Sequence, residues 1–344
     1  MKNSKVVSLR RGQQERQERR RQPRAVEASP VLAEAVRAGL KASPKTLPAA
    51  LLYDDLGSAL FEAITLLPEY EVARADLRLL ESKAFDVGAL LPTADVVELG
   101  PGAGRKAKLF LERFAAGRPV RFSAIDVSEA ALRDCARTVE QVPHVSVSTV
   151  QGRYLDGLND VVAARRPGVP LLVLFLGSNL SNFDRAEAQG FLFAIRRMLR
   201  DGDALLLATD LDKPAAQLIP AYDDACGVTA AFNKNLLVRL NRELSANFDV
   251  SAFHHEARWS TVHRRIEMHL VATRPLEVTL GATGDVFHFA HGESLWTESS
   301  HRFRTDELSG WGHDAGFVTE AQWVDPHWAF AHTLFRVGTS GGRS

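Results

Sequence analysis

Strand-like and helix-like segments alternate between residues 94 and 210, and this alternation limits the possible folds more than any other feature of the chain. Apolar, strand-like runs occupy 95–99, 121–125, 145–150, 170–176 and 204–209. Stretches with helical periodicity occupy 106–115, 128–139 and 185–199. Segments that alternate in this way predict an α/β fold, in which a parallel sheet is covered by helices on both faces.

The segments outside this region extend the prediction. Residues 30–80 have helical periodicity, and Pro68 interrupts it in a loop that can present side chains. After residue 212 the pattern changes, with a helical stretch at 221–244 and strand-like runs at 255–260, 265–272 and 276–280. A helix at 305–315 and strand-like runs at 317–324 and 328–337 follow, and these last two runs are suited to complete the sheet.

A glycine-rich turn lies at the first junction between a strand and a helix. Gly100, Gly102 and Gly104 directly follow the strand-like run 95–99 and precede a helix. Glycine lets the backbone approach a ligand closely, and ligands of open parallel sheets bind beyond the carboxyl ends of the strands. The spacing is Gly-x-Gly-x-Gly and not the Gly-x-Gly-x-x-Gly that seats a pyrophosphate. The turn therefore predicts a nucleotide-type cofactor.

Polar residues end two further strands at the same edge. Asp126 follows the second strand and is suited to a ribose diol, a contact that NAD enzymes also use. These residues alone therefore do not distinguish NAD from S-adenosylmethionine as the cofactor. The small and amide residues of 177–182 follow the fourth strand, where they fit either a ligand-binding loop or an ordinary helix cap.

Composition excludes several classes of protein. Lys and Arg balance Asp and Glu at 42 each, so neither nucleic acid nor an anionic membrane is expected as a partner. No apolar run approaches the ~18 residues of a membrane helix, and no secretory signal is expected. The two cysteines form no CxxC pair, which predicts a reducing, cytoplasmic location. The sequence contains no HExxH motif and no Cys/His set with metal-ligand spacing, so no metal site is expected.

Residues 1–24 form a strongly basic segment with few apolar side chains. Such a segment buries too little apolar surface to offset the entropy of ordering, so a disordered tail is expected. An arm that binds nucleic acid is the alternative.

The chain resembles the histidine-specific N-alpha-methyltransferases of ergothioneine biosynthesis from about residue 36 to 337. The resemblance rests on separated strings in the same order, at 52–62 (LYDDLGSALFE), 67–70, 98–100, 175–178, 221–233 (AYDDACGVTAAFN), 241–244, 265–268 and 297–300. Several strings in order are far more specific than any single loop.

The resemblance implies a fold, a reaction and a domain division. It implies a Rossmann-type methyltransferase domain of residues 74–212 plus 302–344, and a second α+β domain of residues 25–73 plus 213–301. It implies that S-adenosyl-L-methionine methylates the alpha-amino group of L-histidine, up to the trimethylated betaine hercynine. A small-molecule amino-acid substrate, L-histidine, is then the expected partner. The oligomeric state does not follow from the sequence, with a monomer as the expectation.

The resemblance also implies the residues of the site. Substrate contacts fall on Tyr70, Asn182, Tyr222, Met268, Glu298 and Ser300. Cofactor contacts fall on Tyr53, Gly100, Lys106, Asp126, Arg153 and Tyr154. No residue is assigned as a chemical catalyst, because methyl transfer to an amine depends on positioning, which here falls to Asn182 and Tyr53. Glu298 would accept a hydrogen bond from an imidazole N–H, which an apolar pocket does not offer.

The sequence departs from the family pattern at four positions. Glu71 stands where a second tyrosine is common, and Asn179 and Ser181 stand where Thr and Gly are more familiar. Arg153 stands where an acid often meets the adenine amine. These departures leave open the degree of methylation and the exact amino acid. An N-methyltransferase of another aromatic amino acid, and a non-catalytic binding protein on the same fold, are the alternatives.

Overall fold

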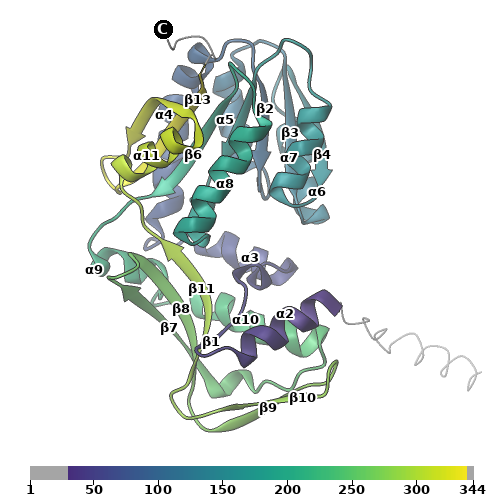
Figure 1. Cartoon of the computed structure of the whole chain (residues 1–344), viewed down its shortest axis with the longest axis vertical. Helices are drawn as coiled ribbons and strands as arrows, with labels where there is room; N and C mark the ends of the chain where they lie inside the picture. The colour runs from purple at the N-terminus through teal and green to yellow at the C-terminus, as the bar shows by residue number, and fades with distance from the viewer. Residues whose placement is uncertain (1–29, 339–344) are drawn as a thin grey trace, which may run out of the picture.

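The computed structural model describes residues 30–338 and contains a large sheet with the strand order β12-β13-β6-β5-β2-β3-β4 (Figure 1). Its strands are β2 (Asp95–Leu99), β3 (Val120–Asp126), β4 (Val145–Gln151), β5 (Leu171–Phe175), β6 (Ala204–Asp210), β12 (Phe317–Val324) and β13 (Phe330–Val337). Strands β2 to β6 pair in parallel, and β13 pairs antiparallel with β6 and β12. The predicted parallel sheet, completed by the C-terminal strands, is confirmed.

Alternating side chains bury both faces of this sheet under helices. The helices are α4 (Glu71–Leu90), α5 (Arg105–Ala115), α6 (Glu129–Val139), α7 (Tyr154–Ala163), α8 (Arg185–Met198) and α11 (Thr305–Ala315). Val96 and Leu172 pack in one apolar cluster with α4, α5 and α6, whereas Val97 and Val173 pack in another with α7, α8 and α11. The period of two along each strand therefore accounts for the helices on both faces.

Helix α7 was not predicted from the sequence. Its residues include Gly157 and Asn159, which have low helix propensity. The glycine has a packing reason, because a Cβ at Gly157 would lie only 2.5 Å from Cγ2 of Ile125 on β3. Close contact with the sheet thus outweighs the weak local preference for a helix.

A second, smaller sheet lies apart from the first and has the order β1-β11-β8-β7 (Figure 1). Its strands are β1 (Lys45–Thr46), β7 (Phe253–Ser260), β8 (Arg265–Ala272) and β11 (Ser294–His301), and a hairpin of β9 (Leu276–Leu280) and β10 (Asp285–Phe289) accompanies them. The helices α2 (Pro30–Lys41), α3 (Asp55–Ile64), α9 (Ala215–Leu218) and α10 (Val228–Glu243) belong to this part of the molecule. Strands β10 and β11 were not predicted from periodicity.

The predicted helix 221–244 was wrong at its beginning. Helix α10 begins at Val228, because Gly227 adopts a left-handed conformation with φ +74° and interrupts the chain there. The carboxylate of Asp224 then accepts hydrogen bonds from the backbone N–H groups of Val228 and Thr229 and starts the helix.

Two segments side by side carry the chain between the two sheets. Leu211 follows β6 and pairs in parallel with Phe303, which lies two residues after β11. The N–H of Asp212 donates to the carbonyl of Phe303 at 2.9 Å. The chain therefore crosses between the two sheets near residues 212 and 301, and the domain boundaries expected there stay a prediction.

No helix within residues 30–338 combines the length and the apolar character that a membrane crossing requires. The predicted disordered tail, residues 1–24, lies outside the described residues.

Candidate active site

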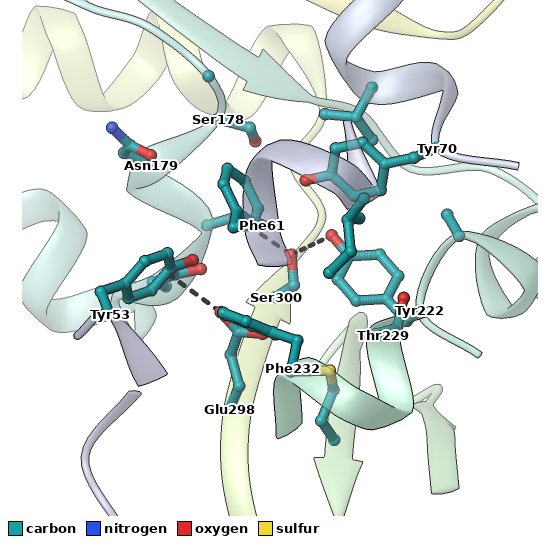
Figure 2. A pocket seen from close by; sticks show the side chains of 17 residues that line it. Tyr53, Phe61, Tyr70, Ser178, Asn179, Tyr222, Thr229, Phe232, Glu298 and Ser300 are labelled. Atoms are coloured by element: carbon teal, nitrogen blue, oxygen red, sulfur yellow. Dashed lines mark hydrogen bonds between the residues drawn. The ribbon is translucent and has the colours of Figure 1, made fainter. Parts of the chain in front are cut away.

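A pocket lies at the carboxyl edge of the large sheet, where elements of the smaller sheet face it (Figure 2). All the residues predicted to contact the substrate line this pocket: Tyr70, Asn182, Tyr222, Met268, Glu298 and Ser300. Tyr53, which was predicted for the cofactor, lines it too. The pocket also contains Phe61 and Phe232, which were part of the quoted strings but were given no role.

A β-bulge in β11 aims two of these side chains. Trp296 pairs with His269 and Glu298 pairs with Met268, so Thr297 is an extra residue in the ladder. An extra residue changes which face the following side chains occupy. Glu298 and Ser300, two positions apart, consequently share the face that lines the pocket.

Aromatic rings form one side of the pocket. The ring of Tyr53 lies 5.6 Å from that of Phe61 and 5.5 Å from that of Phe232, measured between ring centroids. Tyr70 continues the cluster at 6.1 Å from Phe61 and 6.2 Å from Tyr222. The faces of such rings attract a methylated ammonium group through the ring quadrupole.

Glu298 is the acidic group of the pocket. Its side chain is buried, and its Oε1 accepts a hydrogen bond from Nδ2 of Asn182 at 3.4 Å. Burial raises the pKa of Glu298 to about 7, although Arg302 and Asn182 act in the opposite direction. A carboxyl group with this pKa has a substantial carboxylate fraction at neutral pH and accepts a hydrogen bond from a ring N–H.

Hydroxyl groups form the neighbouring wall. The Tyr222 and Ser300 hydroxyls lie 2.8 Å apart, and Ser300 lies 3.2 Å from the Ser181 hydroxyl (Figure 2). His255 fixes Tyr222 from behind, because its Nε2 donates to the Tyr222 carbonyl at 2.7 Å. Nδ1 of His255 then accepts from the amide of Asn233 at 2.9 Å, which settles the tautomer.

The glycine turn provides a second, adjoining surface. Gly100, Gly102 and Gly104 all have positive φ, at +74°, +55° and +77°. A Cβ at Gly100 would lie 3.1 Å from the Tyr154 hydroxyl and 3.4 Å from Nδ2 of Asn179. A Cβ at Gly102 would meet nothing within 4 Å among the described residues. Tyr154 and Asn179 thus lie close to the backbone at Gly100. The next glycine of the turn, Gly102, borders open space.

Asp126 lies beside this turn, at the end of β3. Its carboxylate accepts hydrogen bonds from the backbone N–H groups of Ser128, at 2.9 Å, and of Gly102. Burial nevertheless raises the pKa of Asp126 above its ordinary value. The structure therefore places Asp126 at the turn, as its predicted contact with the ribose requires.

Lys106 is held by Asp76, a residue that was not predicted from the sequence. Nζ of Lys106 lies 2.9 Å from the carboxylate of Asp76, which is fully buried on α4. Asp76 also accepts from the N–H of Gly177 at 3.0 Å and from Nε2 of His332 at 2.6 Å. One acid thus joins α4, the loop after β5 and strand β13 below the predicted cofactor site.

Arg153 does not take part in these contacts through its side chain. The residue is exposed, and within residues 30–338 its side chain forms no hydrogen bond or ion pair. Its carbonyl accepts from the N–H of Gly157 at the beginning of α7. A contact between Arg153 and the cofactor stays a prediction.

The surroundings of Glu98 show whether the residues at the glycine turn fit S-adenosylmethionine. It lies on β2 just before the glycine turn and is 2% exposed, and its Oε2 has no hydrogen-bond partner among the described residues. Burial raises the pKa of Glu98 to about 8, even though Lys106 acts to lower it. A buried acid that lacks a partner fits the cationic end of S-adenosylmethionine, which carries an ammonium and a sulfonium. The residues therefore fit this cofactor.

The raised pKa of Glu98 predicts that S-adenosylmethionine binding releases a proton. Glu98 is protonated at neutral pH when its pKa is about 8, and a nearby cation lowers that pKa. Affinity is therefore expected to increase as the pH rises from about 6 to 8. Calorimetry in buffers of different ionisation enthalpy measures the released proton, which Glu98→Gln should abolish. Equal proton release by Glu98→Gln and the wild-type protein would contradict this assignment.

Comparisons with known proteins place the chain in a family. The family model described as histidine-specific, SAM-dependent methyltransferase matches residues 32–337. A histidine N-alpha-methyltransferase of Mycolicibacterium smegmatis is 38% identical over 309 residues, which cover 89% of this chain and 95% of that protein. Ergothioneine biosynthesis protein 1 of Neurospora crassa is 34% identical over 206 residues, which cover 58% of this chain and 23% of that protein.

A more distant relative has another substrate in its name. The 4-dimethylallyltryptophan N-methyltransferase of Claviceps fusiformis is 26% identical over 314 residues, which cover 83% of this chain and 86% of that protein. The family match nonetheless spans nearly all described residues, from α2 to the end of β13. The chain therefore belongs to the family of S-adenosylmethionine-dependent, histidine-specific methyltransferases.

Proposed function

We propose that this protein transfers methyl groups from S-adenosylmethionine to the α-amino group of L-histidine, up to the trimethylated betaine hercynine. The observation that carries the proposal is the position of Glu298 and Ser300 on one face of β11, inside a pocket walled by aromatic rings. A carboxyl group and a hydroxyl group are two polar partners for the two nitrogens of an imidazole. The names of the relatives from M. smegmatis and N. crassa support the same reaction.

The pocket residues would act by positioning the amine. Tyr222 and Asn182 would hold the substrate carboxylate, while Glu298 and Ser300 would hold the ring. Bound S-adenosylmethionine would supply the methyl group from its sulfonium. Because the transfer is an in-line displacement by a neutral amine, fixed orientation and exclusion of water account for most of the acceleration.

Repeated methylation requires space and attraction for an increasingly methylated nitrogen. The rings of Tyr53, Phe61 and Phe232 provide an apolar surface with a negative face for such a group. This surface favours the betaine as the final product over release after one transfer.

Another aromatic amino acid is the competing substrate class, as the tryptophan-derived substrate in the name of the C. fusiformis relative illustrates. An indole has a single N–H and would leave either Glu298 or Ser300 without a ring partner. A ligand that leaves a buried polar group without a hydrogen-bond partner binds less favourably than one that pairs with it. Histidine is therefore expected to be the preferred substrate.

A panel assay tests the substrate directly. Purified protein with S-adenosylmethionine is incubated with single amino acids, and product mass is read at one, two and three added methyl groups. We expect L-histidine to reach three methyl groups, and tryptophan, tyrosine and phenylalanine to react far more slowly. Methylated tryptophan or tyrosine without methylated histidine would overturn the proposal.

A further inference from the structure

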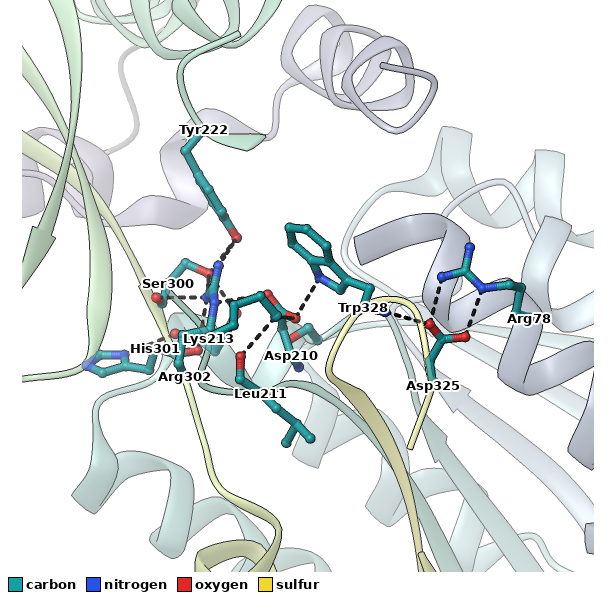
Figure 3. Close-up of polar contacts among 12 residues, drawn as sticks. Arg78, Asp210, Leu211, Lys213, Tyr222, Ser300, His301, Arg302, Asp325 and Trp328 are labelled. Carbon is teal, nitrogen blue, oxygen red and sulfur yellow. Dashed lines mark hydrogen bonds and ion pairs between the residues drawn. The ribbon is translucent and has the colours of Figure 1, made fainter. Parts of the chain in front are cut away.

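Arg302 lies behind the hydroxyl wall of the pocket and does not line the pocket itself (Figure 3). It directly follows β11 and is fully buried, at 0% exposed. Its Nη2 donates to the Tyr222 hydroxyl at 3.0 Å, and its Nη1 donates to the Ser300 hydroxyl at 2.8 Å. Arg302 can therefore influence a ligand through these two hydroxyl groups.

The guanidinium fixes the direction of the hydrogen bonds in this wall. Arginine has donors only, so the oxygens of Tyr222 and Ser300 both act as acceptors toward Arg302. The hydroxyls have one proton each, and their mutual contact at 2.8 Å uses one of the two. The remaining proton is free to point toward the pocket or Ser181. The wall thus offers a donor to a ligand, and a carboxylate, which only accepts, is its natural complement.

The charges behind the wall also favour an anion. Nε of Arg302 lies 2.9 Å from Oδ2 of Asp210, and Lys213 forms an ion pair with the same carboxylate (Figure 3). Burial lowers the pKa of Lys213 to about 8, which still leaves it mostly protonated at neutral pH. Oδ1 of Asp210 additionally accepts from Nε1 of Trp328 at 3.0 Å. Two cations therefore share one buried carboxylate, because Asp212, the other acid that acts on Lys213, is exposed and screened by solvent.

Glu298 does not cancel this excess. Arg302 lowers the pKa of Glu298, yet burial has the larger effect and keeps that pKa at about 7. The Glu298 carboxyl group is thus only partly ionised at neutral pH. A buried positive charge that shares its buried counter-ion with a second cation is stabilised by an anionic group that enters the adjoining pocket.

We propose that Arg302 is a positioning residue that makes this enzyme select amino acids with a free α-carboxylate over the corresponding amides. Arg302 would act through the Tyr222 and Ser300 hydroxyls and through the positive charge that it contributes behind them. The inference rests on the proposed function and adds to it the part of the substrate that must be anionic.

The test compares L-histidine with L-histidinamide, which retains the ring and the amine but has no carboxylate. We measure kcat and KM for both substrates with the wild-type enzyme, Arg302→Met and Arg302→Lys. The difference in amine basicity between the two substrates cancels when each variant is compared with the wild type. Arg304→Met is the matched control, because Arg304 is exposed and pairs with Asp306 away from the pocket.

We expect Arg302→Met to reduce the preference for histidine over histidinamide by at least ~10-fold, mainly through KM for histidine, because the hydroxyl wall then loses both its fixed hydrogen-bond direction and the positive charge behind it. Arg302→Lys should restore part of this preference, and Arg304→Met should retain all of it. A preference within about 2-fold of wild type in Arg302→Met, which is small beside that expected loss, would overturn the inference. Equal losses for both substrates would do so as well.

Two further measurements keep the outcome decisive. Circular dichroism and S-adenosylmethionine binding show whether each variant folds. If Arg302→Met does not fold, Arg302→Gln takes its place, because glutamine retains a hydrogen-bond donor but has no charge. Failure of the wild-type enzyme to methylate histidine would refute the proposed function. An active wild type whose carboxylate preference survives in the folded Arg302 variants would refute only the role of Arg302.

Discussion

Replacement of Asp76 by alanine is expected to lower the free energy of unfolding by about 3–5 kcal/mol, the usual cost of removing one partner of a buried ion pair. The carboxylate of Asp76 accepts from Lys106, from the N–H of Gly177 and from His332. Alanine would remove the acceptor of all these donors, and the buried His332 would lose it where water does not reach, whereas the Lys106 side chain is 33% exposed and keeps some contact with solvent. The same change should weaken S-adenosylmethionine binding, since Lys106 is a predicted cofactor contact and Asp76 holds it in place.

Denaturant unfolding measures this effect, with Asp86→Ala as the matched control. Asp86 lies on the same helix, α4, but is exposed, and its ion-pair partner within residues 30–338 is Lys83, at 3.5 Å. We expect the control to change stability by less than about 0.5 kcal/mol and Asp76→Asn to lie between the two alanine variants. A loss below about 1 kcal/mol for Asp76→Ala would contradict the assigned network.

The contribution of Asp76 should also depend on pH. Burial acts to raise the pKa of Asp76, but Lys106 and His332 outweigh it and hold the pKa well below its ordinary value. A carboxyl group whose pKa is depressed by folding stabilises the protein above its unfolded pKa of about 4, and this stability is lost as the pH falls below that value. The difference between wild type and Asp76→Asn should therefore shrink in acid.

Replacement of Glu298 by alanine is expected to lower kcat/KM for histidine at least ~10-fold relative to an aromatic amino acid, about 1.4 kcal/mol. The reason is the loss of the acceptor for the ring N–H, whereas an apolar ring loses nothing comparable. Steady-state kinetics with histidine and phenylalanine give the ratio. Glu277→Ala is the control, because Glu277 is an exposed acid on β9. Unchanged selectivity in Glu298→Ala would remove this residue from the ring-contact role.

The large sheet could be predicted from the sequence because its strands are continuous apolar runs between helical segments. Strand β11 could not, because its sequence mixes polar and apolar residues and contains a bulge at Thr297. Glu298 and Ser300 lie on this strand, and neither its periodicity nor its composition identified them. Both residues were predicted from the resemblance to the family, and both line the pocket.

Asp76 and Arg302 could not be predicted for a different reason. A single charged residue in a helix or after a strand usually lies in solvent, and its sequence neighbours do not show otherwise. The partners that bury these residues are distant in sequence, since Asp76 meets His332 and Arg302 meets Asp210. Such groups meet only in the folded chain, so local sequence patterns do not reveal these contacts.

The position of the methyl groups on the product shows directly whether the α-amino nitrogen of histidine is the acceptor. Purified protein is incubated with S-adenosylmethionine and L-histidine that is isotopically labelled at the α-amino nitrogen, and the product is analysed by tandem mass spectrometry and NMR. We expect three methyl groups on the labelled nitrogen and an unmodified ring. Methyl groups on a ring nitrogen, or no methylated histidine at all, would contradict it.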